Sequence, residues 1–254
     1  MERKMNDWVG NLIAFLAVLV VNYLSNALPI GGQTPKDVSD KYPTLFTPES
    51  FTFAIWGIIY LAIAAFVIYQ ALPAQRHNRQ IARISPWFQL SCVANIAWIF
   101  CWHYELLALS MLVMLGLLTT LIMVYCHLHI ATRPAPLHER LLLQLPFSLY
   151  LGWISVAAIA NLSVLQTAYG LENFEWDAVS WTLLKLALVT AITAVVITLR
   201  RDWVYGLVIA WAAFGIMMKQ VATPVVAGAA TSLIMTVLLL LTFMGIRYLL
   251  AKTS

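Results

Sequence analysis

Eight apolar stretches fill almost all of this chain of 254 residues, and they constrain its fold more than any other feature. They run approximately over residues 8–27, 51–72, 86–102, 106–130, 141–165, 181–199, 203–218 and 225–250. Most of them reach the roughly 20 apolar residues that one bilayer crossing needs. The sequence therefore predicts an all-α fold, a polytopic transmembrane helical bundle of about eight spans.

The composition excludes a soluble domain. Hydrophobic residues make up 62% of the chain and charged residues only 10%, and the mean hydropathy is +0.83. Both values are typical of an integral membrane protein. The net charge of +4 predicts no nucleic-acid partner, because the basic residues lie in short loops beside the anionic headgroups of membrane lipids.

Basic residues alternate between the two sides that eight crossings create. One side holds 11 of the 15 Lys and Arg residues: Arg3, Lys4, Arg76, Arg79, Arg83, Arg133, Arg140, Arg200, Arg201, Arg247 and Lys252. The other side holds Lys36, Lys41 and Lys219, and Lys185 lies about one turn inside the sixth span, where we expect it to snorkel to the interface. The positive-inside rule then predicts a multi-pass protein with cytoplasmic N- and C-termini, which suits a bacterial inner membrane.

Few residues of this chain indicate catalysis or metal binding. The acidic residues all lie in loops or at span ends, so we expect no buried carboxylate pair for acid and base chemistry. His127 and His129 are two apart and point to different faces of a helix, which disfavours a metal site. His103 fits a plain interfacial turn better than a pocket mouth. Cys92, Cys101 and Cys126 are expected to be packing residues.

Two loops on the outer side are long enough to divide the chain. Residues 29–49 are rich in proline and glycine, and a loop of this length can act as a lid. Residues 166–180 carry Glu172, Glu175 and Asp177 without a basic residue. We therefore divide the chain into a five-helix core over 1–165, an acidic external connector over 166–180, and a three-helix C-terminal extension over 181–254.

Aromatic and amide residues recur at helical spacing within the spans. The first span places Asn11, Asn22 and Asn26 within about 60° of one another at roughly 100° per residue. Three later spans each place a ring and small or polar atoms on one face: Phe53, Trp56 and Tyr60; Asn95, Trp98 and Trp102; and Trp153, Ala157 and Asn161. This pattern predicts either a pocket for a flat apolar ligand or aromatic helix packing with amides as glue.

The same residues resemble a known family, the tryptophan-rich sensory proteins or translocator proteins (TspO/MBR family). Residues 47–60, TPESFTFAIWGIIY, are similar to its second-helix signature. The resemblance continues through Gln89, Asn95 and Trp98, through His103 with residues 107–109, and through residues 153–161. It covers roughly residues 11–165. It departs from the family at Thr47 and Leu149, where the family has proline, and in the three added helices.

The resemblance implies a five-helix bundle with a pocket under the first loop, often in a homodimer. The implied ligand is a hydrophobic small molecule such as a porphyrin or haem, and no cofactor is certain. The implied ligand-binding residues are Phe53, Trp56, Tyr60, Asn95, Trp98, Trp153, Ala157 and Asn161. The family's sterol-recognition pattern is missing, because Tyr169 has no basic residue nearby.

Three functions remain open at this stage. The first is a membrane receptor, sensor or carrier that binds a flat hydrophobic ligand such as a tetrapyrrole. The second is a membrane enzyme that modifies a tetrapyrrole or an isoprenoid-like lipid, and the third is a small-solute permease. The missing intramembrane carboxylates disfavour the permease and weaken the case for an enzyme. In each case we expect that residues after about Gly170 do not build the ligand site.

Overall fold

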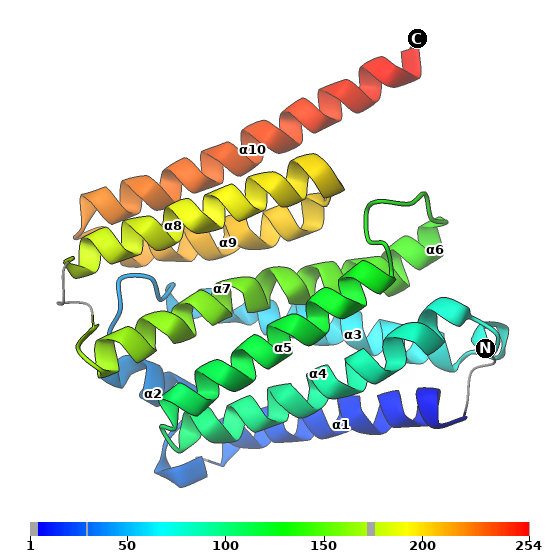
Figure 1. Cartoon of the computed structure of the whole chain (residues 1–254), viewed down its shortest axis with the longest axis horizontal. Helices are drawn as coiled ribbons and strands as arrows, with labels where there is room; N and C mark the ends of the chain where they lie inside the picture. The colour runs from blue at the N-terminus through cyan, green and yellow to red at the C-terminus, as the bar shows by residue number, and fades with distance from the viewer. Residues whose placement is uncertain (1–4, 29, 172–175, 254) are drawn as a thin grey trace.

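A computed structural model describes residues 5–28, 30–171 and 176–253, and no strand occurs within these ranges. Eight apolar helices run side by side in it (Figure 1). They are α1 (Met5–Ala27), α3 (Ile55–Ala71), α4 (Arg79–His103), α5 (Leu107–His127), α7 (Leu145–Ala168), α8 (Ala178–Val195), α9 (Trp203–Lys219) and α10 (Pro224–Thr253). Two shorter helices, α2 (Pro35–Lys41) and α6 (Leu137–Glu139), lie in the connections. The prediction of an all-α membrane bundle is confirmed.

Seven of these apolar helical segments are long enough to cross a membrane by length and composition. Helix α3 reaches this length only with the 3₁₀ turn before it, as the segment Ser50–Ala71. Helix α9 is the exception, because its 17 residues span about 25 Å at roughly 1.5 Å per residue. It is as apolar as the others and packs between α7 and α10. The protein is therefore an integral membrane protein.

The third predicted span begins seven residues too late. Helix α4 starts at Arg79, and Pro86 lies inside it. Asn78 caps the helix, because its side-chain oxygen accepts hydrogen bonds from the backbone N–H groups of Gln80 and Ile81 at 3.0 and 3.3 Å. The prediction followed hydropathy alone, and so it assigned the polar first turns of α4 to a loop.

Both long connections contain ordered structure. The first loop includes the short helix α2. The acidic connector shrinks to the residues between Ala168 and Ala178, where Asp177 caps α8 by accepting a hydrogen bond from Ser180 N at 2.7 Å. Glu172 and Glu175 lie outside the described residues, as do Arg3 and Lys4.

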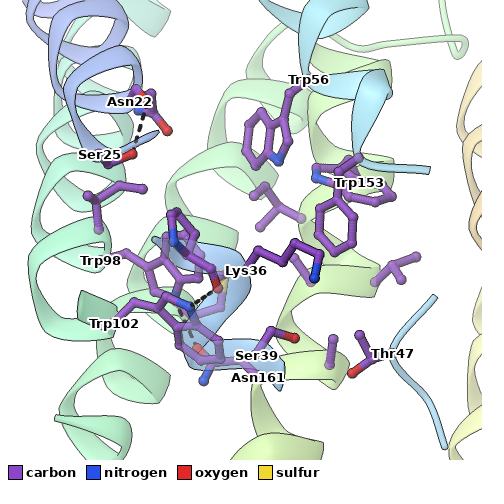
Figure 2. A pocket seen from close by; sticks show the side chains of 18 of the residues that line it. Asn22, Ser25, Lys36, Ser39, Thr47, Trp56, Trp98, Trp102, Trp153 and Asn161 are labelled. Atoms are coloured by element: carbon purple, nitrogen blue, oxygen red, sulfur yellow. Dashed lines mark hydrogen bonds between the residues drawn. The ribbon is translucent and has the colours of Figure 1, made fainter. Parts of the chain in front are cut away.

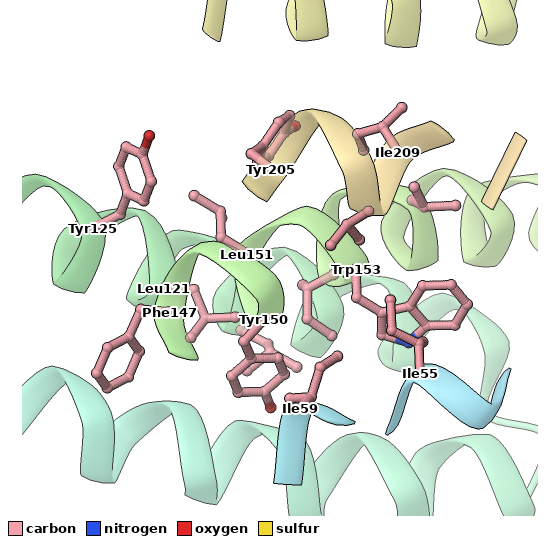
Figure 3. Close-up of a cluster of buried hydrophobic side chains, with 14 of the residues drawn as sticks. Ile55, Ile59, Leu121, Tyr125, Phe147, Tyr150, Leu151, Trp153, Tyr205 and Ile209 are labelled. Carbon is pink, nitrogen blue, oxygen red and sulfur yellow. The ribbon is translucent and has the colours of Figure 1, made fainter. Parts of the chain in front are cut away.

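Helices α8, α9 and α10 pack on one side of the first five, chiefly through α9 and α7 (Figure 1). A Cβ at Gly152 would lie 3.0 Å from Val208 Cβ, so glycine permits the close approach of these two helices. Figure 3 shows the same interface, where Tyr205 and Ile209 of α9 lie over Leu151 of α7. One continuous cluster of buried apolar side chains joins both groups of helices.

A buried carboxylate also links the two groups. Asp202 is only 3% exposed, and its Oδ2 accepts hydrogen bonds from Tyr125 Oη at 2.9 Å and Ser148 Oγ at 2.6 Å. Its Oδ1 accepts from the backbone N–H groups of Val204 and Tyr205, each at 3.1 Å. Asp202 stands at a span end, as predicted, but α5 and α7 enclose it. Its four donors replace water and make burial of the charge tolerable.

Lysine 185 does not snorkel to the interface. Its side chain is 8% exposed, and its Nζ donates to Ser163 Oγ at 2.8 Å across the contact between α8 and α7. The prediction was wrong because it treated α8 as an isolated helix in lipid. In the bundle, α7 supplies a polar partner at the depth of the ammonium group.

A candidate ligand-binding cavity

A cavity of about 710 Å³ opens among α1, α3, α4, α5 and α7, beneath the first loop. Its volume lies within the range of small-molecule sites, which is about 300–1,000 Å³. All eight predicted site residues line it: Phe53, Trp56, Tyr60, Asn95, Trp98, Trp153, Ala157 and Asn161. The helical spacing thus identified side chains that share one cavity, and their binding of a ligand stays a prediction.

One wall of the cavity is an aromatic cluster from α3 and α7. Trp56 stacks on Tyr60 with ring centroids 5.3 Å apart and planes inclined by 23°. Trp153 meets Trp56 edge-on at 6.3 Å and Phe53 edge-on at 5.6 Å. Trp56 and Tyr60 lie four residues apart on α3 and so share one face of it. Phe53 joins them from the 3₁₀ turn Ser50–Ala54, which leads directly into α3.

The opposite wall is a second aromatic pair, on α4. Trp98 stacks on Trp102 at 5.4 Å with planes inclined by 25°. Trp98 Nε1 donates to Asn161 Oδ1 at 3.0 Å, and Trp102 Nε1 donates to the carbonyl oxygen of Pro35 at 3.0 Å. Figure 2 shows this pair across the cavity from Trp56 and Trp153. The two aromatic walls therefore face each other across an open space.

The amides Asn95 and Asn161 connect neighbouring helices through hydrogen bonds. Asn95 Oδ1 accepts from Asn22 Nδ2 at 2.8 Å, and Asn95 Nδ2 donates to Tyr150 Oη at 3.2 Å. Asn161 Nδ2 donates to Ser110 Oγ at 3.1 Å, while its oxygen holds Trp98. These bonds fix the positions of the aromatic walls. The amides therefore link helices, as the packing alternative predicted, and the same residues also line a cavity, whose binding of a ligand stays a prediction.

Two indole donors remain available at the cavity. Within the described residues, neither Trp56 Nε1 nor Trp153 Nε1 has a protein acceptor, although both side chains line the cavity. A buried indole N–H normally finds a partner. The cavity therefore combines apolar walls with convergent donors, which is the composition of a binding site.

The first loop closes the cavity with α2 as its ordered part. Thr34 begins α2 with a capping box, in which Asp37 N donates to Thr34 Oγ1 and Thr34 N donates to Asp37 Oδ2. Val38 of α2 is fully buried against Trp102, Leu107 and Val164. The loop is thus packed on the bundle above the cavity, and we call residues 30–49 the lid.

Glu105 fixes this lid to the turn between α4 and α5. It accepts hydrogen bonds from Lys41 Nζ at 2.5 Å, Gln33 Nε2 at 3.0 Å and Tyr42 Oη at 2.8 Å. These donors, with Lys41 contributing most, lower the pKa of Glu105 to about 2. The carboxylate therefore stays ionised throughout the physiological range.

Helix α9 supports the lid from the other side. Glu49 N donates to the carbonyl oxygen of Gly215 at 3.1 Å, and Trp211 Nε1 donates to the carbonyl oxygen of Thr52 at 2.9 Å. Lys219, at the end of α9, lines the cavity itself. The expectation that residues after Gly170 do not build this site is therefore wrong. Lys219 reaches the cavity through the packing of α9 on the lid, and such packing leaves no periodic pattern in the sequence.

Sequence reasoning missed other lining residues as well. Lys36, Asp40 and Glu49 face the cavity from the lid, and Asn22 faces it from α1. Only Asn22 had a usable signal, namely the shared face of Asn11, Asn22 and Asn26. The positions of the lid residues depend on how the first loop folds back over the helices, and the helical spacing of residues in the sequence does not predict this.

The histidines and cysteines form no metal site. In the parts of the chain that the structure describes, no three His, Cys, Asp or Glu side chains are grouped for a metal ion. His103 is buried instead of lying in a plain interfacial turn, since its Nδ1 lies 2.7 Å from the carbonyl oxygen of Ile99. Cys92 and Cys101 are buried and unpaired with each other, as packing residues would be.

Comparison with known families gives one result. The family model described as TSPO-like protein matches residues 7–244. This match includes α8, α9 and most of α10, and so it extends well beyond the resemblance over residues 11–165. Searches among curated proteins and among solved structures find no match to this chain.

Proposed function

Because this chain belongs to the family of TSPO-like proteins, we propose that it binds a flat hydrophobic small molecule in the cavity beneath its lid. The ligand class is a porphyrin, haem or a similar tetrapyrrole. The protein would act as a membrane receptor, sensor or carrier for it. The observation that carries this proposal is the pair of aromatic walls that face each other across about 710 Å³ of open space.

The walls suit a planar ring system. Trp56 with Tyr60 on one side and Trp98 with Trp102 on the other offer stacking faces, and aromatic contacts of this kind contribute roughly 0.5–1.5 kcal/mol each. The indole N–H groups of Trp56 and Trp153 can donate to acceptor atoms at the ligand's edge. Because Asn161 holds Trp98 in place, that ring is already oriented before a ligand arrives.

Binding is favoured over turnover by the state of the acidic groups that line the cavity. Asp40 is paired with Lys36, and the Glu49 carboxylate accepts hydrogen bonds from Ser50 N and Ser50 Oγ. Both lie in the lid, and hydrogen bonds from Ser50 lower the pKa of Glu49. The lowered pKa makes Glu49 a weaker base for taking a proton from a substrate.

The cytoplasmic position of both termini is part of the proposal. In Figure 1 the chain enters and leaves at the same end of the bundle, as an even number of crossings requires. The described basic residues Arg76, Arg79, Arg83, Arg133, Arg140, Arg200, Arg201 and Arg247 belong to the connections and helix ends on that side. Lys36, Lys41 and Lys219 belong to the opposite side, with the lid. The positive-inside rule then places the lid and the cavity mouth outside, and a bacterial inner membrane fits this arrangement.

The experiment that tests the proposal is identification of the bound molecule. The protein is purified in mild detergent, and the compounds it retains are identified by mass spectrometry after denaturation. The proposal expects a tetrapyrrole or another flat conjugated molecule in wild-type protein, and less of it in Trp153→Leu. A compound retained equally by both would not occupy this cavity. The homodimer remains a prediction, and the molecular mass of the undenatured protein in the same detergent tests it.

A further inference from the structure

Among the residues that the structure describes, four charged side chains line the cavity, all at its lid side. They are Lys36, Asp40, Glu49 and Lys219, and the deeper lining is apolar or aromatic with the amides already described. Lys36 and Asp40 form an ion pair with each other across one turn of α2. The charges of Lys36 and Asp40 cancel each other. The other two charged groups at the cavity mouth are Glu49 and Lys219.

Glu49 has its own hydrogen bonds. Its Oε1 accepts from Ser50 N at 3.1 Å and from Ser50 Oγ at 3.0 Å. Lys219 is near enough to help lower the pKa of Glu49, yet within the described residues Lys219 forms no ion pair within 4.0 Å. The Lys219 ammonium group is therefore a cation at the mouth with capacity for an anion.

The position of Lys219 is fixed by α9. Gly215 precedes it by four residues, so both lie on the same face of the helix. At Gly215 that face lies against the lid, because a Cβ there would lie 3.0 Å from Pro48 Cβ. Gly215 O also accepts a hydrogen bond from Glu49 N at 3.1 Å. Lys219 lies in the last turn of α9, where the negative end of the helix dipole stabilises a cation. The contact at Gly215 thus turns Lys219 towards the cavity.

We propose that Lys219 is a ligand-contacting residue, which binds the acidic group of an amphipathic ligand whose flat apolar part lies between the two aromatic walls. This inference rests on the proposed function and specifies its ligand class, an amphipathic anion with a carboxylate at one edge. An ammonium group pairs with a carboxylate through a charge-assisted hydrogen bond. Helix α9 thereby contributes ligand chemistry to the cavity as well as support for its lid.

The test compares an acid with its neutral ester. The probes are protoporphyrin IX, which carries two propionates, and its dimethyl ester, which carries none. Their affinities are measured on the full-length protein, in wild type and in Lys219→Met. We expect the variant to bind the acid roughly fivefold more weakly, the scale of one partly exposed charge pair, with unchanged affinity for the ester. Lys219→Arg should restore most of the acid's affinity.

A matched control removes one positive and one negative side chain from the same cavity mouth, so the net charge there stays the same. The double variant Lys36→Met/Asp40→Asn eliminates the ion pair of α2, and it should leave the ratio of acid to ester affinity unchanged. Raising the salt concentration should weaken binding of the acid to wild type and not to Lys219→Met.

The outcomes separate the two proposals. If both probes bind wild type and the ratio of their affinities is the same in Lys219→Met, Lys219 does not contact the ligand, and the proposed function still stands. If neither probe binds wild type saturably, both proposals fail. A loss of both probes to the same extent in a folded Lys219→Met variant assigns Lys219 to support of the lid and overturns its role as an anion ligand.

Discussion

Gly215 of α9 packs against Thr52 so closely that no side chain fits between them. A Cβ at Gly215 would lie 2.9 Å from Thr52 Oγ1, nearer still to Thr52 Cγ2, and 3.0 Å from Pro48 Cβ. Thr52 and Pro48 belong to the segment that joins the lid to α3, beside Phe53. Helix α9 therefore helps to position the segment that joins the lid to the cavity.

Gly215→Ala should destabilise the protein and loosen this segment. Thr52 is β-branched and buried and cannot move aside freely, so the overpacking should cost about 1–3 kcal/mol. The measurement is the midpoint of thermal unfolding in detergent. Gly228→Ala is the control, because a Cβ there meets nothing within 4 Å, and it should be neutral or slightly stabilising. Equal effects of the two substitutions would contradict the role given to Gly215.

Asn161→Leu should disorder Trp98. The substitution removes the acceptor of Trp98 Nε1 and leaves a partly buried donor unpaired, which costs about 1 kcal/mol. Adding Trp98→Phe to Asn161→Leu removes the unpaired donor and should recover part of that stability. The unfolding free energies of wild type, both single variants and the double variant form a double-mutant cycle. Additive effects would show that the two side chains do not interact.

The lid anchor should resist acid. The pKa of Glu105 is lowered to about 2, so its contribution is present above the ordinary pKa of a glutamate and is lost as the pH falls through the lowered value. Hydrogen exchange of residues 33–42 should therefore change little between pH 7 and pH 4.5, after correction for the intrinsic rate.

Glu105→Gln tests the same anchor at neutral pH. The variant loses the charge that pairs with Lys41 and should show faster exchange across residues 33–42, by the effect of about 1 kcal/mol that partly exposed pairs give. The exchange rates of the variant and of wild type should become equal only at strongly acidic pH, where Glu105 of the wild type is protonated and has also lost its charge. Identical exchange in the variant and in wild type at pH 7 would remove Glu105 as the anchor.

The sequence predicted the parts of this structure that depend on local periodicity. Helical spacing placed Phe53, Trp56 and Tyr60 on one face, and likewise Asn95 with Trp98 on α4, and all of these line the same cavity. Hydropathy located the spans but missed the first turns of α4, where Asn78 caps a polar start. Those first turns contain the charged residues Arg79 and Arg83 and are nevertheless helical.

The features that the sequence did not predict depend on packing between distant segments. Lys185 and Asp202 are buried because α7 supplies hydroxyl partners, Ser163 and Ser148, at the right depth. Lys219 reaches the cavity because α9 packs on the lid. None of these relationships follows from residues near one another in the chain, and no periodic pattern marks them.

Topology reporters test the orientation. A reporter fused to the C-terminus and another inserted at Arg79 should both read cytoplasmic, and one inserted at Pro35 should read external. The physical basis is the concentration of 11 of the 15 Lys and Arg residues on one side. The same reading at Pro35 and at the C-terminus would mean that an even number of crossings separates them, which would contradict the eight spans.

The most direct measurement of the central claim is a porphyrin titration followed by tryptophan emission. A porphyrin between the aromatic walls should quench the emission saturably, and Trp56→Leu and Trp153→Leu should each weaken binding by about 1–2 kcal/mol, the scale of a lost aromatic contact with its buried area. Trp203→Leu is the control, because Trp203 is exposed at the far end of α9 and does not line the cavity. The account predicts saturable quenching that weakens in the first two variants and not in the third. Non-saturable quenching, or equal affinity in wild type and in folded Trp56→Leu and Trp153→Leu variants, would contradict it.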